Sequence, residues 1–163
     1  MKKKAGFLLV SVGLVAGLSI FAAQAAPAFK VTGGGQTDIG TSGPGDTIAF
    51  NAQNTGEGNA AKGQVQYVDR EGGKVVEVYH GSVTCLMAVD AGEEGAARFA
   101  GEFTTQGSGP FEIYVEDNGE PNQGNDLIFI DQNDPPDCDD SDDDDEDGAT
   151  GLGRGNVQVH GSE

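Results

Sequence analysis

A run of aspartates near the carboxyl end of the chain is the stretch whose residue types and spacing most clearly indicate chemistry. Ten acidic residues lie among the fourteen from Asp134 to Asp147. Within this run Asp143, Asp145 and Asp147 alternate with other residues and are followed by Gly148. This is the spacing of the first half of a calcium loop, in which alternate carboxylates turn toward the ion and glycine permits a sharp bend. The three aspartates are therefore candidate calcium ligands.

The second half of the calcium-loop pattern does not match. The twelfth position, which should hold a bidentate glutamate, is Arg154, and the ninth is Gly151. An aspartate run also produces alternating carboxylates by chance, so two alternatives stay open. One is a weak calcium site with a dissociation constant of about 10⁻⁴ to 10⁻³ M, and the other is a solvated polyanionic loop. For both, the sequence predicts an acidic disordered loop at residues 132–150, because the charge density and Pro135-Pro136 exclude a buried strand.

A second, sparser set of carboxylates surrounds the loop after residue 116. Asp117, Glu120 and Asp126 are hard oxygen ligands that one rigid turn could direct at a calcium ion. The same residue types are also typical of turn formation and of capping at the end of a hairpin. This set is therefore the weaker of the two calcium candidates.

Residues suited to catalysis are scarce. The segment Gly40–Pro44 misses the last glycine of the G-x-S-x-G nucleophile motif. His80 lies near Ser82, but two neighbours on one face of a strand do not imply a catalytic triad. With His160 as the only other histidine, a zinc site is not expected. The sequence thus predicts no catalytic residue and no cofactor other than calcium, although paired carboxylates for glycoside hydrolysis stay open among 27 acids.

Two cysteines, Cys85 and Cys138, are separated by 53 residues. In an oxidising compartment we expect them to form a disulfide. The chain-entropy model assigns such a bond about 4 kcal/mol, provided that the two strands or loops approach closely enough. The alternative is a pair of unrelated thiols.

Short runs of alternating apolar and polar residues must position these side chains. Phe111 to Glu116 has the period of a strand with one buried and one wet face, and Leu127 to Ile130, apolar on both sides, predicts a deeply buried strand. Residues 74–89 form either two strands or one long strand bent at a bulge. Other strands are expected near residues 29–32 (ended by glycines 33–35), 46–52, 64–67, 99–103 and 156–160. The prediction is one antiparallel β-sandwich or small barrel of seven to nine strands.

The first residues indicate export. Lys2 to Lys4, an apolar stretch from Phe7 to Ala23 and an Ala-x-Ala site ending at Ala25 predict a signal peptide at residues 1–25, followed by one domain at 26–163. An uncleaved membrane anchor is the alternative. Cleavage would leave six basic and 27 acidic residues, a formal charge of −21. Such a field repels nucleic acid and anionic lipid, so neither nucleic-acid binding nor membrane insertion of the mature chain is expected.

Four segments carry a family resemblance: Val31–Gly35, Ile48–Ala52, Val115–Pro121 and Gly153–Val159. They are similar to the TGGG, FGFNA, V-x-V-x-D-x-GEPG and GGGNI-x-V patterns of a poorly characterised β domain of secreted bacterial proteins, the post-choice-of-anchor type often found beside choice-of-anchor domains. The chain departs from these patterns at Asn122-Gln123 and at Arg154, and its aspartate run looks like an insertion. The resemblance implies a secreted β fold and, because the family has no established activity, no mechanism.

These observations favour a non-enzymatic secreted or cell-envelope module with a structural or interaction role. The role does not depend on calcium, but the Asp-rich loop is a candidate for weak calcium binding. The partner is an unknown extracellular or envelope component. The alternative is an extracellular hydrolase or a carbohydrate-binding module. The chain has no tryptophan and three tyrosines, which disfavours the stacking surface on which many sugar-binding modules depend.

Overall fold

Eight antiparallel strands form a closed barrel in which each strand pairs with the next and β8 returns to β1. The computed structural model describes residues 29–37, 45–89, 95–105, 109–119, 126–132, 138 and 149–161. The strands are β1 (Lys30–Thr37), β2 (Thr47–Asn54), β3 (Ala60–Glu71), β4 (Lys74–Val89), β5 (Ala96–Phe103), β6 (Pro110–Glu116), β7 (Leu127–Asp131) and β8 (Thr150–His160). The all-β prediction of seven to nine strands is confirmed, and the architecture is a barrel.

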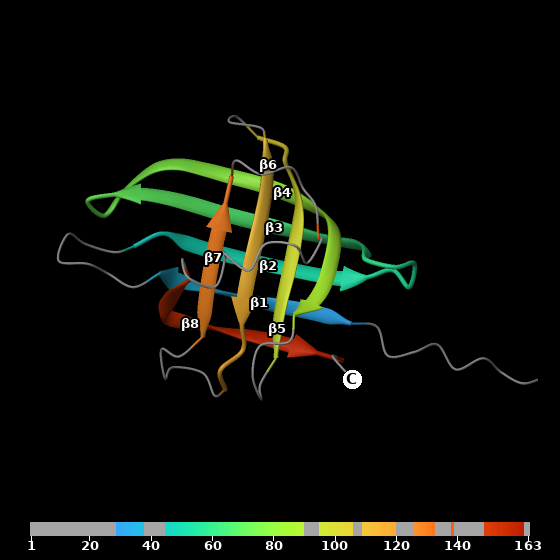
Figure 1. The fold of residues 1–163 in the computed structure, drawn as a ribbon. Coiled ribbons are helices and arrows are strands. Elements are labelled where there is room, and N and C mark those ends of the chain that lie inside the picture. Colours follow the sequence, from blue (N-terminus) through green and yellow to red (C-terminus); the bar gives the residue numbers. More distant parts are fainter. Residues whose placement is uncertain are drawn as a thin grey trace, which may run out of the picture.

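The barrel is flattened into two layers (Figure 1). Strands β1 to β4 and β8 form one layer, and β5 to β7 cross it steeply in the other. Figure 1 shows β4 curving from the first layer toward the second, and its register with β5 shifts between Val83 and Cys85. Residues 74–89 are therefore one long strand with a bulge, the second of the two alternatives that the sequence left open, since an extra residue at a bulge increases strand bending.

Aromatic rings fill the space between the layers, and glycines give them room. The rings of Phe50 and Phe99 lie 5.1 Å apart, and those of Phe103 and Phe111 lie 4.7 Å apart. A Cβ placed on Gly33 would come within 2.8 Å of the Phe50 ring, closer than van der Waals contact allows. Glycines 33–35 were expected to end the first strand, and this was wrong. They lie inside β1, where a Cβ on Gly33 would meet the Phe50 ring and a Cβ on Gly34 or Gly35 would meet a backbone oxygen of a neighbouring strand.

Strands β7 and β8 close the barrel over a short distance. Only Leu127 with Gly151 and Ile128 with Thr150 are paired. The backbone N–H of Leu152 continues the seam by donating to the backbone oxygen of Asp126 at 2.9 Å. Ile128 is the one fully buried residue of β7, so the expectation of a strand buried on both faces was wrong. Its other side chains are half-buried; Ile130 packs against the core beside Ile128, and Leu127, Phe129 and Asp131 alternate with these two toward the outer surface of the second layer.

Within the described residues no helix is long and apolar enough to cross a membrane. The segment predicted as a signal peptide, residues 1–25, lies outside those described.

Candidate functional site

The outer face of the first layer is open to solvent. The pairing places Asn51 of β2 beside Gln64 of β3, which in turn lies beside Ser82 of β4. One row further along, Gln66 of β3 lies beside His80 of β4. All five side chains are exposed, because they alternate with the inward-facing residues of their strands. We call this surface, formed by the outward residues of β8, β1, β2, β3 and β4, the open face.

Two adjoining hollows mark the open face. The first has a volume of about 400 Å³, and its polar lining consists of Asn51, Gln64, Gln66, His80, Ser82 and Thr104. The second has a volume of about 440 Å³ and is lined by Lys30, Asn51, Ala52, Gln53, Lys62, Gly63 and Gln64. They share Asn51 and Gln64, and neither lining includes a carboxylate. The result is a continuous strip of amides and hydroxyls with lysines at one end.

Acidic residues are missing from most of this layer, although the chain contains 27 of them. Strands β1, β2 and β8 contain no aspartate or glutamate. The acids of the neighbouring strands β3 and β4 are Asp69, Glu71 and Glu77, all near the hairpin that joins these two strands. Among the described residues, the part of the open face that forms the two hollows thus carries no carboxylate, although the protein is strongly acidic.

At the hairpin end of the layer, acidic side chains accept hydrogen bonds from tyrosine hydroxyls. The Tyr67 hydroxyl donates to Asp46 Oδ2 at 2.7 Å, and Asp46 Oδ1 accepts from the backbone N–H of Arg70 at 2.7 Å. Burial, followed by the hydrogen bond to Asp46, raises the pKa of Tyr67 well above its usual value. Burial and then the charge of Asp46 also raise the pKa of Asp69. These contacts hold the acids at the end of the barrel, away from the two hollows.

The outer face of the second layer is covered. Arg98 of β5 and Tyr114 of β6 both point outward, yet Tyr114 is fully buried and the Arg98 side chain is 4 % exposed. Arg98 Nε lies 3.0 Å from Glu112 Oε1. The sequence predicted a solvent-exposed outer face for β6, and this was wrong for Tyr114. Alternation along a strand shows that a side chain points away from the core, but another segment of the chain can still cover that side chain.

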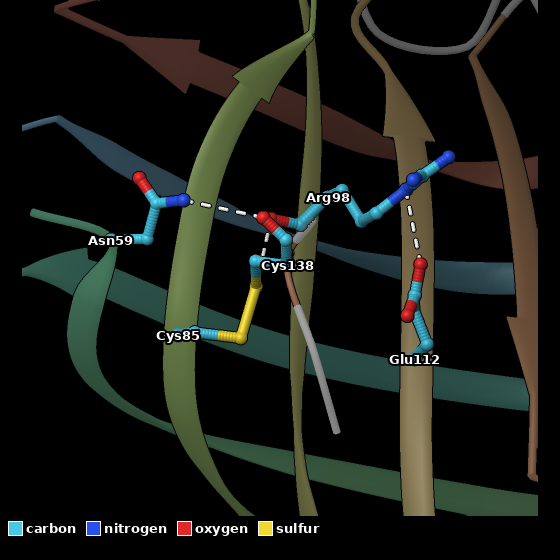
Figure 2. Close-up of polar contacts among 5 residues, drawn as sticks. All are labelled: Asn59, Cys85, Arg98, Glu112 and Cys138. Carbon is cyan, nitrogen blue, oxygen red and sulfur yellow. Dashed lines mark hydrogen bonds and ion pairs between the residues drawn. A yellow bond between two sulfur atoms is a disulfide. The ribbon is translucent and has the colours of Figure 1, made fainter. Parts of the chain in front are cut away.

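A disulfide anchors part of this cover. Cys85 of β4 is bonded to Cys138, with their Cα atoms 6.0 Å apart, which confirms the predicted bond. Figure 2 shows Cys138 against β5 beside Arg98, whose guanidinium extends toward Glu112 of β6. The amide of Asn59 donates to the backbone oxygen of Cys138 at 3.2 Å. Cys138 belongs to the acidic stretch in sequence, so the bond ties that stretch to the covered face.

The aspartates of the weaker calcium candidate lie at the barrel seam. Asp126 is buried, and its two oxygens accept backbone hydrogen bonds from Val157 at 2.6 Å and from Asn118 at 3.1 Å. Asp117 Oδ2 accepts from the backbone N–H of Val159 at 3.1 Å. Both carboxylates therefore satisfy N–H groups of β8 beyond its short pairing with β7, which is a capping role. Calcium binding by this set stays a prediction, because its third member, Glu120, lies outside the described residues.

The remaining residues singled out from the sequence are the stronger calcium candidate and the pair His80 and Ser82. Asp143, Asp145 and Asp147, the stronger calcium candidate, lie outside the described residues. Among the residues that are described, no group of three or more histidines, cysteines or carboxylates could hold a metal ion. His80 and Ser82 point to the same side of β4, as expected for neighbours at a spacing of two, and both line the first hollow.

Sequence reasoning missed the open face and the buried Arg98–Glu112 pair. The amides that line the hollows belong to two strands, and each strand contributes only two of them, so the pattern becomes visible after the register is known. The one signal available beforehand was the lack of acidic residues from Phe29 to Thr37 and again from Thr47 to Gly56. No protein-family model, curated protein or solved structure matches this chain.

Proposed function

We propose that this domain is a non-enzymatic secreted or cell-envelope module that binds a partner through its open face. The contrast between the two outer faces carries the proposal. The second layer buries outward side chains such as Arg98 and Tyr114, whereas the first layer presents exposed amides and hydroxyls around two hollows. An exposed polar surface without charge repulsion inside it is suited to a polar partner.

The disulfide supports an extracellular role for the module. Such bonds form and persist in oxidising compartments, and the bond between Cys85 and Cys138 accords with the export signal read at the start of the chain. The barrel interior is filled by aromatic and aliphatic side chains, so binding through the surface suits this fold better than binding inside it.

The acidic stretch is a second, separate element of the proposed function. Its carboxylates repel one another, and a divalent cation would relieve that repulsion. Because Cys138 is bonded to Cys85, cation binding close to this bond would be coupled to the barrel. We propose that the stretch responds weakly to calcium and that this response is independent of the open face.

The interaction function is tested by retention of envelope material on the immobilised domain. Gln64→Glu/Gln66→Glu places negative charge in the first hollow with almost no change of shape. Gln132→Glu is the matched control, because Gln132 is exposed just after β7, in the other layer. We expect the wild type and the control to retain the same material and the double variant to lose it. Equal retention by all three proteins would refute binding through the open face.

A further inference from the structure

We propose that the ligand of the open face is a polysaccharide that carries carboxylates, an inference that rests on the interaction function proposed above. Its hydroxyls would contact Asn51, Gln64 and Gln66, and its carboxylates would contact Lys30 and Lys62. The two adjoining hollows supply the binding strip, and each of the next observations restricts what can occupy it.

The position of the lysines sets the spacing of charge on the ligand. Lys30 of β1 pairs with Gln53 of β2, and Gln53 pairs with Lys62 of β3. Two strand intervals of about 4.8 Å therefore separate the two lysine backbones, or about 10 Å in all. Lys30 also lies beside His160 of β8. A linear polymer with repeated carboxylates can contact both lysines at once.

The amides select for hydroxyl groups. Each Asn or Gln side chain offers two donors and one acceptor oxygen, so it can pair with a sugar hydroxyl in either direction. Ser82 and Thr104 at the edge of the first hollow add two hydroxyls of the same dual character. This lining fits a polyhydroxylated chain better than an apolar ligand, which would leave the amides without partners.

A peptide strand is a poorer occupant of this surface. Peptides often bind β proteins by adding a strand to an exposed sheet edge. Strands β2 and β3 are each paired on both sides along the hollows. Their backbone groups are therefore engaged, and the strip can offer only side chains to a ligand.

A charged sugar chain fits better than a neutral one. Neutral sugars are commonly held by stacking on aromatic rings, but Tyr67 and Tyr79 lie on the inner side, stacked on each other with centroids 5.8 Å apart, and Tyr114 is buried on the other layer. Lys30 and Lys62 must then supply much of the affinity. The net charge of −18 opposes a polyanion at long range, but screening over about 8 Å at physiological salt favours contacts with the nearest charges.

The test is calorimetric titration at physiological ionic strength with polygalacturonate, alginate and hyaluronate as probes, and with carboxyl-reduced polygalacturonate as the neutral match. EDTA is present throughout, because a divalent cation would bridge ligand carboxylates to the acidic stretch. We expect the wild type to bind at least one acidic polymer, and to bind the neutral match at least about tenfold more weakly, since charge-assisted contacts are the stronger ones.

Two lysine variants identify the surface. Lys62→Gln should weaken binding about tenfold, and Lys74→Gln should leave it unchanged, because Lys74 is also an exposed lysine but lies at the tip of the β3–β4 hairpin, outside both hollows. Equal losses in the two variants would indicate unspecific attraction and overturn the proposal, as would equal affinity for the neutral match or no binding to any acidic polymer. If the polymers fail while envelope retention still depends on Gln64 and Gln66, the interaction function stands and the ligand class is wrong. Protease-sensitive retention would then indicate a protein partner.

Discussion

The buried carboxylate of Asp126 should be the most sensitive position of the barrel seam. Its oxygens accept hydrogen bonds from the backbone N–H groups of Val157 and Asn118, and Val157 lies in the part of β8 that extends beyond its pairing with β7. Asp126→Asn keeps the size of the side chain but replaces one acceptor oxygen by an NH₂ donor. Asp126→Ala removes both acceptors.

The expected magnitudes follow from counting these hydrogen bonds. A hydrogen bond to a charged group contributes about 1.5 to 3 kcal/mol, and a buried N–H without a partner costs a similar amount. Asp126→Asn should therefore lower the free energy of unfolding by about 2 kcal/mol, and Asp126→Ala by about 4 kcal/mol. For a domain of this size the melting temperature should fall by roughly 4 °C per kcal/mol. Asp117→Asn should cost less, because the bond that Asp117 makes to Val159 is longer and less buried.

Urea denaturation and amide hydrogen exchange would measure the effect. Exchange should accelerate at Val157, while the amide of Val65, in the opposite part of the first layer, keeps its protection. Glu57→Gln, which makes the same charge change at an exposed loop position, controls for net charge. A free energy within about 0.5 kcal/mol of the wild type for Asp126→Asn would refute the capping role. A loss that appears only in the presence of calcium would instead support the metal-ligand hypothesis for this set.

Three further outcomes are expected. Denatured, unreduced protein should show no free thiol on titration, and replacing both bridged cysteines by serine should cost about 4 kcal/mol in the free energy of unfolding. Millimolar Ca²⁺ should raise the melting temperature more than Mg²⁺ does, because Mg²⁺ requires stricter octahedral geometry. Calorimetric titration should show that the preference for Ca²⁺ is lost in the triple variant Asp143→Asn/Asp145→Asn/Asp147→Asn. Equal responses of the wild type to the two ions would leave only the solvated-loop alternative. The folded state raises the pKa of Tyr67, so the Tyr67 hydroxyl contributes its full stabilisation below pH 10 and loses it as the pH rises further. Denaturation curves should therefore show that the free energy of unfolding falls less at alkaline pH in Tyr67→Phe than in the wild type.

Much of the strand pattern was predictable because it is local. The strand expected near residues 46–52 is β2, and Ile48, Phe50 and Ala52, at alternate positions along it, are all buried. The strand expected near residues 99–103 lies within β5, and Phe99 and Phe103, an even number of positions apart, both lie in the core cluster. Period-two burial depends on the chain direction alone, so it is visible in each segment before any partner strand is known.

The errors arose where a second segment decides the environment. Glycines 33–35 were expected to end the first strand, but they continue β1, where the Phe50 ring occupies the space that a side chain on Gly33 would take. Tyr114 read as exposed, but the outer face of β6 is covered. In both cases a contact with a segment far away in the sequence determined the outcome.

The amino-acid sequence alone was sufficient for the all-β class and for a range of seven to nine strands, and it favoured a bond between the two cysteines, since these inferences depend on residue type and short-range periodicity. The barrel's closure, the capping of β8 by Asp126 and the open face depend on register between strands far apart in the chain. A shift of one residue in that register would turn Gln64 inward and Val65 outward. The candidate binding surface therefore exists only as a product of tertiary structure, because no single segment contains enough of its side chains to reveal it.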